Sequence, residues 1–172
     1  RAQVGELSGT PEEYGLRLAL GSTRVRLLDL AAAYGAFVRG GTIIAPRGVR
    51  SLLAPDGRQI TPPASTVTSV MPSEVAYIVM DMLADPEARR PRFGDDLPFD
   101  LPYRVAAKTG TARGFSDTLA VATTRELTVA AWTGRFDGRA MEGLSGMRGA
   151  AWLARAALLT AAKGRNLSLP SR

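Results

Sequence analysis

The stretch that decides the fold is YRVAAKTGTARGFSDTLAVATTRELTVAAWTG, residues 103–134. It contains three short runs of apolar and β-branched residues, at 103–107, 118–123 and 127–134, with turn-like residues between them. Runs of this length and composition predict β-strands, and their close succession along the chain favours antiparallel pairing. The sequence therefore predicts a three-stranded antiparallel sheet.

The segments on both sides of this sheet have helical periodicity. Apolar residues recur every three or four positions over residues 23–39, and two glycines end that run. A further helix is predicted from Pro72 to about Leu83, and the alanine- and leucine-rich segment 150–163 predicts the last one. The fold class is therefore mixed α/β of the α+β type, an antiparallel sheet flanked by helices.

The remaining segments complete one domain, residues 1–164. A turn at residues 8–11 precedes a short helix, and Pro55-Asp56-Gly57 between two β-type runs predicts a hairpin. The organisation expected is helices and a hairpin over 1–84 with a loop at 61–69, a long loop with four prolines over 85–103, strands over 104–134, a helix over 150–163 and a frayed tail over 165–172.

Composition excludes several kinds of site. The chain has no Cys and no His, which excludes thiolate and imidazole metal ligands and the Ser-His-Asp type of catalysis. We therefore expect no metal and no cofactor. The net charge of +6 comes from arginines scattered along the chain, without the aromatic interleaving of a nucleic-acid site, so no nucleic acid is expected as a partner.

The segment whose residues could form a binding or catalytic site is Lys108-Thr109-Gly110-Thr111, at the end of the first predicted strand. Because side chains alternate along a strand, Lys108 projects to one face, and Thr109 and Thr111 share the other. At a sheet edge, free N–H groups can pair with an extended peptide, which Gly110 lets approach closely. Such a site suits a carboxylate-bearing peptide, because Lys and Thr donate to a carboxylate and a strand N–H stabilises an oxyanion.

Two other interpretations apply to the same four residues. A lysine near a strand end is commonly a solvated surface residue, and a motif of four common residue types also occurs by chance. A phosphate-binding loop requires the pattern G-x-x-x-x-G-K-[ST], and Ala107 instead of glycine precedes Lys108. The phosphate interpretation is therefore excluded, and the wider sequence has to decide between a substrate site and a solvated strand end.

Several segments occur in the order found in one known family. They are Tyr14-Gly15-Leu16, Leu18–Gly21, Val25–Tyr34, Gly40-Gly41, Lys108–Thr111, Gly114-Phe115-Ser116-Asp117 and Trp132–Gly138. Lys-Thr-Gly is a signature of penicillin-binding proteins and serine β-lactamases. In this order the segments resemble the C-terminal half of the transpeptidase domain of class A penicillin-binding proteins, over roughly residues 14–162.

The resemblance implies a serine acyltransferase that cross-links peptidoglycan stem peptides ending in D-Ala-D-Ala and that β-lactam antibiotics acylate. By position, Lys108 would maintain the electropositive network around the nucleophile, and Thr109 and Thr111 would bind the substrate carboxylate. The Thr111 N–H would be half of the oxyanion hole, and Gly110 would admit the substrate backbone. Ser116 and Asp117 are possible further site residues.

The sequence also departs from the family pattern. It contains neither S-x-x-K nor S-x-N, so the nucleophile and its partners are expected upstream of Arg1, with a membrane anchor that places the protein at the periplasmic side of the bacterial inner membrane. Arg24 stands where the family usually has Glu, and Thr118-Leu119 follows Asp117 where Ala-Trp is usual. The alternative is a non-catalytic remnant that serves as a peptide-binding or interaction module.

Two structural expectations follow. Lys108–Thr111 should lie on an edge strand that lines a groove. The loop 85–103 enters that strand, so it should border the groove and adjust substrate entry through Arg89, Arg90 and Arg92.

Overall fold

The protein is described here by a computed structural model, which covers residues 9–21, 23–95, 97–141, 143–165 and 167–170. Its elements, in chain order, are α1 (Pro11–Tyr14), the 3-10 helix η1 (Gly15–Leu20), α2 (Leu27–Val38), β1 (Thr42–Ile44), β2 (Leu52–Leu53), β3 (Gln59–Ile60), β4 (Val67–Ser69), α3 (Ser73–Leu83), α4 (Arg90–Phe93), β5 (Ala106–Thr111), the 3-10 helix η2 (Arg113–Phe115), β6 (Asp117–Thr123), β7 (Thr128–Gly134) and α5 (Ala150–Ala161).

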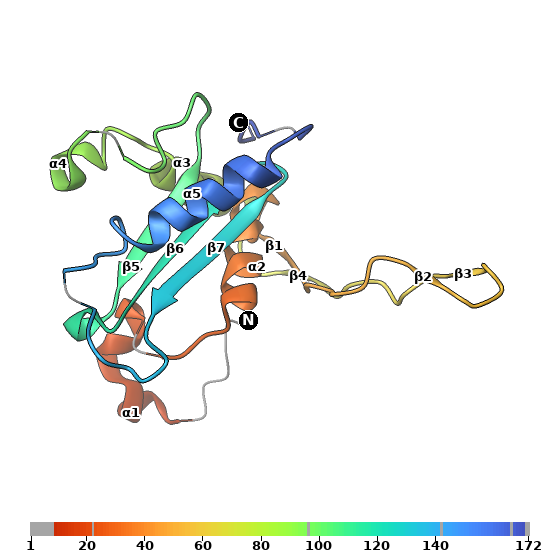
Figure 1. Cartoon of the computed structure of the whole chain (residues 1–172), viewed down its shortest axis with the longest axis horizontal. Helices are drawn as coiled ribbons and strands as arrows, with labels where there is room; N and C mark the ends of the chain where they lie inside the picture. Colours follow the sequence, from red (N-terminus) through yellow and green to blue (C-terminus); the bar gives the residue numbers. More distant parts are fainter. Residues whose placement is uncertain (1–8, 22, 96, 142, 166, 171–172) are drawn as a thin grey trace.

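The body of the molecule has three layers. The central layer is the antiparallel sheet β5-β6-β7, in which Lys108 lies opposite Val121 and Val121 opposite Ala130. Helix α5 crosses one face of this sheet, and α2 and α3 cover the other (Figure 1). The predicted antiparallel sheet flanked by helices is confirmed.

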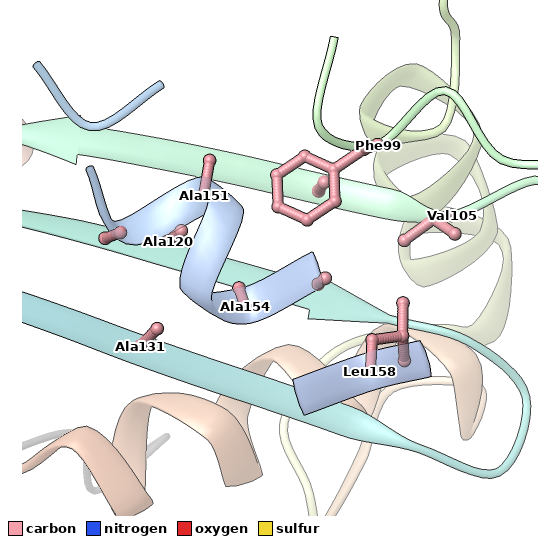
Figure 2. Packing of buried hydrophobic residues seen from close by; sticks show 10 residues of the cluster. Phe99, Val105, Ala120, Ala131, Ala151, Ala154 and Leu158 are labelled. Atoms are coloured by element: carbon pink, nitrogen blue, oxygen red, sulfur yellow. The ribbon is translucent and has the colours of Figure 1, made fainter. Parts of the chain in front are cut away.

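The core between α5 and the sheet consists mainly of alanines. Ala120 and Ala131 on the sheet meet Ala151 and Ala154 of the helix, which Figure 2 shows side by side. Such small side chains let helix and sheet approach closely, and Phe99, Val105 and Leu158 fill the space toward one end of the helix. Leu158 is fully buried, so it contributes roughly 2–3 kcal/mol of hydrophobic stabilisation.

Helix starts follow local capping. Thr10 caps α1 and forms a capping box with Glu13, and α1, the predicted short helix, begins at Pro11. The prediction that the second helix starts at residue 23 is wrong by four residues, because α2 begins at Leu27. Arg26 is its extended N-cap, and its guanidinium pairs with Asp29 at 2.7 Å. Val25 fits the helical period but lies outside the helix.

A long arm extends from the body at residues 45–66 (Figure 1). The predicted hairpin is confirmed at its tip, where β2 pairs with β3. The loop predicted over residues 61–69 is wrong at its end, since β4 pairs with β1 at the base of the arm. Leu52, Leu53 and Ile60 are exposed on the arm, and Leu53 is 73% exposed.

The loop 85–103 does not border the groove as predicted. Its second half packs on the α5 face of the sheet, where Phe99 joins the alanine core, whereas Lys108 projects from the opposite face. The apolar residue Phe99 of the loop thus packs in the core rather than at the sheet edge. Within the loop, Arg90 pairs with Glu87, and Arg89 donates to Val105 O, just before the motif strand.

The segment expected to fray is packed where the structure describes it. Leu169 lies against the cluster formed by Met80, Ala84 and Ala106, on the α3 side of the sheet. Residues 166, 171 and 172 lie outside the described part. Among the helices described, none has the length and hydrophobicity needed to cross a bilayer.

Candidate functional site

The site predicted from sequence lies on an edge strand of the described sheet, because the strand order places β5 beside β6 only. Ala106 is buried against α3 residues, and Lys108 projects from the same face but is exposed. Thr109 and Thr111 lie on the α5 face, because alternate residues of a strand share a face and Ala107 is part of the core packed against α5. The expected alternation of side chains is confirmed.

The backbone of β5 turns every second residue to the open edge. The N–H of Ala112 donates to Asp117 O at 2.9 Å, so Ala112 faces β6, its antiparallel neighbour. In an antiparallel strand a residue directs its N–H and C=O to the same side, and successive residues alternate. Thr109 and Thr111 therefore present their N–H groups to the open edge.

Two of the carbonyl oxygens on that edge already have partners. The Lys108 ammonium donates to Thr109 O at 2.6 Å, and Arg89 Nη2 donates to Val105 O at 2.9 Å. Among the described residues no partner is found for the outward N–H groups of Thr109 and Thr111. The edge beside Lys108 therefore offers mainly donors, which suits a ligand rich in carbonyl and carboxylate oxygens.

Gly146 is a contact of the site that sequence reasoning missed. Its N–H donates to Thr111 Oγ1 at 3.0 Å across 35 residues of sequence. A Cβ at Gly146 would stand 2.5 Å from Gly110 O and 3.1 Å from Thr109 Cβ, so only glycine fits. In the sequence, Gly143, Gly146 and Gly149 indicate only a turn into the last helix, and no local signal connects them to the motif.

Gly110 is different, because the described chain leaves space at its α carbon. A Cβ there would have Leu119 Cβ at 3.8 Å as its nearest neighbour, which is ordinary van der Waals contact. Nothing within the described residues thus requires glycine at position 110. A requirement for glycine would have to come from a molecule that approaches the strand from outside.

Ser116 and Asp117 lie at the turn into β6. Ser116 Oγ donates to Asp117 Oδ2 at 3.3 Å, and the neighbouring Phe115 has a positive φ of 56°. The carbonyl of Asp117 accepts a hydrogen bond from the N–H of Ala112, so Ser116 and Asp117 shape the turn that follows Thr111. Among the described residues, no group of three or more His, Cys, Asp or Glu side chains is arranged to hold a metal ion.

Comparison with known proteins shows which family this sequence and fold match. Residues 4–140 match the family model of the penicillin-binding protein transpeptidase domain. The chain belongs to the penicillin-binding protein transpeptidase family. It is similar to penicillin-binding protein 1C of Escherichia coli strain K12, with 35% identity over 135 residues, which cover 78% of this chain and 16% of that protein.

Solved structures of the family are similar in fold. The PonA1 protein of Mycobacterium tuberculosis, in complex with penicillin V, superposes with a TM-score of 0.69 and 27% identity, over 90% of this chain and 43% of that one. Penicillin-binding protein 1A of Haemophilus influenzae gives a TM-score of 0.70 at 17% identity, over 91% of this chain and 29% of that one. The chain thus spans less than half the length of these relatives.

Proposed function

We propose that this chain is the KTGT-bearing half of a peptidoglycan DD-transpeptidase, a penicillin-binding serine acyltransferase that cross-links stem peptides. The observation that carries the proposal is the donor-rich open edge of β5, where Lys108 and two outward N–H groups lie together. A stem peptide ending in D-Ala-D-Ala is a matching ligand, because it brings a scissile carbonyl and a terminal carboxylate to that edge.

Each motif residue has a part in this proposal. The Thr111 N–H stabilises the oxyanion of the tetrahedral intermediate, and Thr109 and Thr111 donate hydroxyl hydrogen bonds to the carboxylate. Lys108 keeps the site electropositive and exchanges its present acceptor, Thr109 O, for the substrate or the nucleophile. Gly110 lets the peptide lie close to the strand, and Asp117 with Ser116 fixes the turn that follows.

The nucleophile comes from an upstream half of the same domain, which carries S-x-x-K and S-x-N. The described chain offers no substitute, because no serine in the sequence has a lysine three residues later. The matched share of the relatives, 16% of penicillin-binding protein 1C, leaves room for that half. By analogy with these relatives the protein acts at the periplasmic side of the inner membrane, held there by an anchor in another part of the protein.

β-Lactams are the second ligand class. PonA1 has been solved with penicillin V, and the family's other solved members include complexes with aztreonam and ampicillin. In this chain the carboxylate of a β-lactam would occupy the same donors as the substrate carboxylate, at Thr109 and Thr111. The alternative function, a peptide-binding remnant without catalysis, would use the same edge for reversible binding.

Intact mass after incubation with a penicillin tests the proposal. The 172-residue chain alone should form no covalent adduct, whereas the chain joined to its upstream half should form one per molecule. In the longer protein, Lys108→Ala or Thr109→Ala should slow acylation, because each removes a side-chain donor to the substrate or the nucleophile. A stoichiometric adduct on the short chain would contradict the proposal, with Ser116→Ala as the next variant, and no adduct on the longer protein would favour the remnant.

A further inference from the structure

The hydroxyl of Thr111 is held from outside its own strand. Within the residues that the structure describes, the only hydrogen bond found at Thr111 Oγ1 is the one that it accepts from the N–H of Gly146, at 3.0 Å. Thr111 is otherwise exposed at the end of β5. The orientation of this hydroxyl therefore depends on where the backbone of Gly146 lies.

Gly146 is itself anchored to α5. Its carbonyl accepts from the N–H of Ala151, in the first turn of that helix, at 2.9 Å. On either side of Gly146, the carbonyl of Ser145 accepts from the N–H of Gly149 at 2.8 Å, and Met147 packs against the alanine core. A group fixed in this way on a rigid element is preorganised for its partner. The Gly146 N–H thus ties the position of the Thr111 hydroxyl to helix α5.

A donor at this place decides what the hydroxyl can bind. A threonine hydroxyl has one hydrogen to donate and two lone pairs that accept. The Gly146 N–H occupies one lone pair and offers no acceptor, so the hydroxyl hydrogen of Thr111 has to point elsewhere. An ionised carboxylate only accepts hydrogen bonds. Gly146 therefore keeps the hydroxyl as a donor, the form that a carboxylate ligand requires.

The missing side chain of Gly146 is what permits this approach. A Cβ at that position would lie 2.5 Å from Gly110 O and 3.1 Å from Thr109 Cβ, so both close contacts are with the motif itself. A larger residue must move the segment away from β5, and the bond to Thr111 Oγ1 then lengthens. The glycine thus connects the start of α5 to the donor geometry of the motif.

We propose that Gly146 is a positioning residue of the transpeptidase site, whose N–H turns the Thr111 hydroxyl toward the terminal carboxylate of the substrate. The proposal rests on the proposed function, which supplies the carboxylate ligand. Gly146 does not touch this ligand and acts only through Thr111. Its loss should therefore affect ligands that carry the carboxylate and spare those in which the carboxylate is blocked.

Penicillin V and its methyl ester test this difference in the protein that joins this chain to its upstream half. The second-order rate constant of acylation is measured for both, and the ratio of acid to ester is the carboxylate preference. In Gly146→Ala the carboxylate preference should fall by about twofold to tenfold, the range of one net hydrogen bond. Equal losses for acid and ester would indicate a merely structural role and would overturn the proposal.

The matched control is Gly149→Ala, in the same segment. A Cβ there would lie 2.9 Å from Leu144 Cδ2 and 3.0 Å from Thr133 Oγ1, so it overpacks the segment without meeting the motif. This variant should lower the thermal midpoint and leave the carboxylate preference unchanged. A fall equal to that of Gly146→Ala would contradict a specific role of Gly146.

Two further variants separate the N–H from the bulk of the added Cβ. In a Thr111→Val background, Gly146→Ala should cause no additional fall in the carboxylate preference, because the hydroxyl through which Gly146 acts is absent. Replacing Gly146 by glycolic acid turns its N–H into an ester oxygen and adds no Cβ, so it also decides the matter if Gly146→Ala does not fold. An unchanged preference in the glycolic acid variant would overturn the proposal.

The outcomes distinguish this proposal from the proposed function. Normal acylation with an unchanged preference in Gly146→Ala would contradict the Gly146 proposal alone. Absence of acylation in the unaltered longer protein would contradict the proposed function, and Kd values for the acid and the ester then replace the rate constants. Gly146→Ala should lower that Kd-based preference by the same factor, and an unaltered protein that does not prefer the acid would overturn the Gly146 proposal as well.

Discussion

The α5–sheet layer and the arm at residues 45–66 use similar residue types in opposite ways. In the layer, Leu158 is fully buried among alanines, whereas Leu53 on the arm is 73% exposed. The arm has only short strand pairs, β1–β4 and β2–β3, and a lone two-stranded hairpin has marginal stability in water. Apolar residues therefore stabilise this fold only where a second layer covers them, and the motif strand lies in the covered part.

The largest expected effect separates the two regions directly. Leu158→Ala should lower the free energy of unfolding by about 2–5 kcal/mol, because it removes buried methyl groups and leaves a cavity. Leu53→Ala on the arm is the matched control and should change it by less than about 0.5 kcal/mol. Urea denaturation of both variants measures the difference. Equal losses would show that the Leu53 side chain on the arm is packed as closely as the Leu158 side chain in the α5–sheet layer.

The second prediction compares two glycines at the motif. Gly146→Ala places a Cβ 2.5 Å from Gly110 O, so the segment must move and the bond to Thr111 weakens. We expect a loss of about 1–3 kcal/mol, the usual cost of overpacking. Gly110→Ala has its nearest neighbour at 3.8 Å and should be close to neutral in stability. Thermal unfolding of both variants checks this. A destabilised Gly110→Ala would show that other residues of this chain require glycine at position 110.

The regions also differ in how far sequence predicts them. Strands β5–β7 follow one another closely, so local alternation and turn residues predicted three consecutive antiparallel strands. The edge position of Lys108 was expected from the family resemblance. Strands β1 and β4 have three residues each and pair Thr42 with Ser69, which leaves no local signal. The same limit applies to the site, because the contact of Arg89 with Val105 spans 16 residues and that of Gly146 with Thr111 spans 35.

The third prediction concerns a pair of threonines within the layer, of which Thr118 is buried and Thr133 half-buried. Thr118 Oγ1 lies 2.6 Å from Thr133 Oγ1 and accepts from the N–H of Ala150 at 3.4 Å, at the start of α5. Thr118→Val keeps the shape but leaves these groups without a partner, which should cost about 1–2 kcal/mol. Thr61→Val, at an exposed position of the arm, is the control and should be neutral in urea denaturation. A neutral Thr118→Val would show that the hydroxyl pair adds no stability.

The smallest effect is expected at the turn that follows β7, where charges are exposed as on the arm. Hydrogen bonds from the guanidinium of Arg135 and from the backbone N–H of Arg139 lower the pKa of Asp137 from its ordinary 3.8 to about 2. Because the folded-state pKa lies below the unfolded value, the associated stabilisation is present above about pH 4 and is lost as the pH falls toward 2.

Solvent screens such exposed pairs, so the thermal midpoint at neutral pH should not change measurably in Arg135→Gln. The pKa itself should rise toward 3.8 in that variant, as followed by NMR titration of the Asp137 carboxyl carbon. A pKa that stays near 2 without Arg135 would assign the effect to Arg139, and a fall in the thermal midpoint would show that this exposed turn stabilises the fold as the covered layer does.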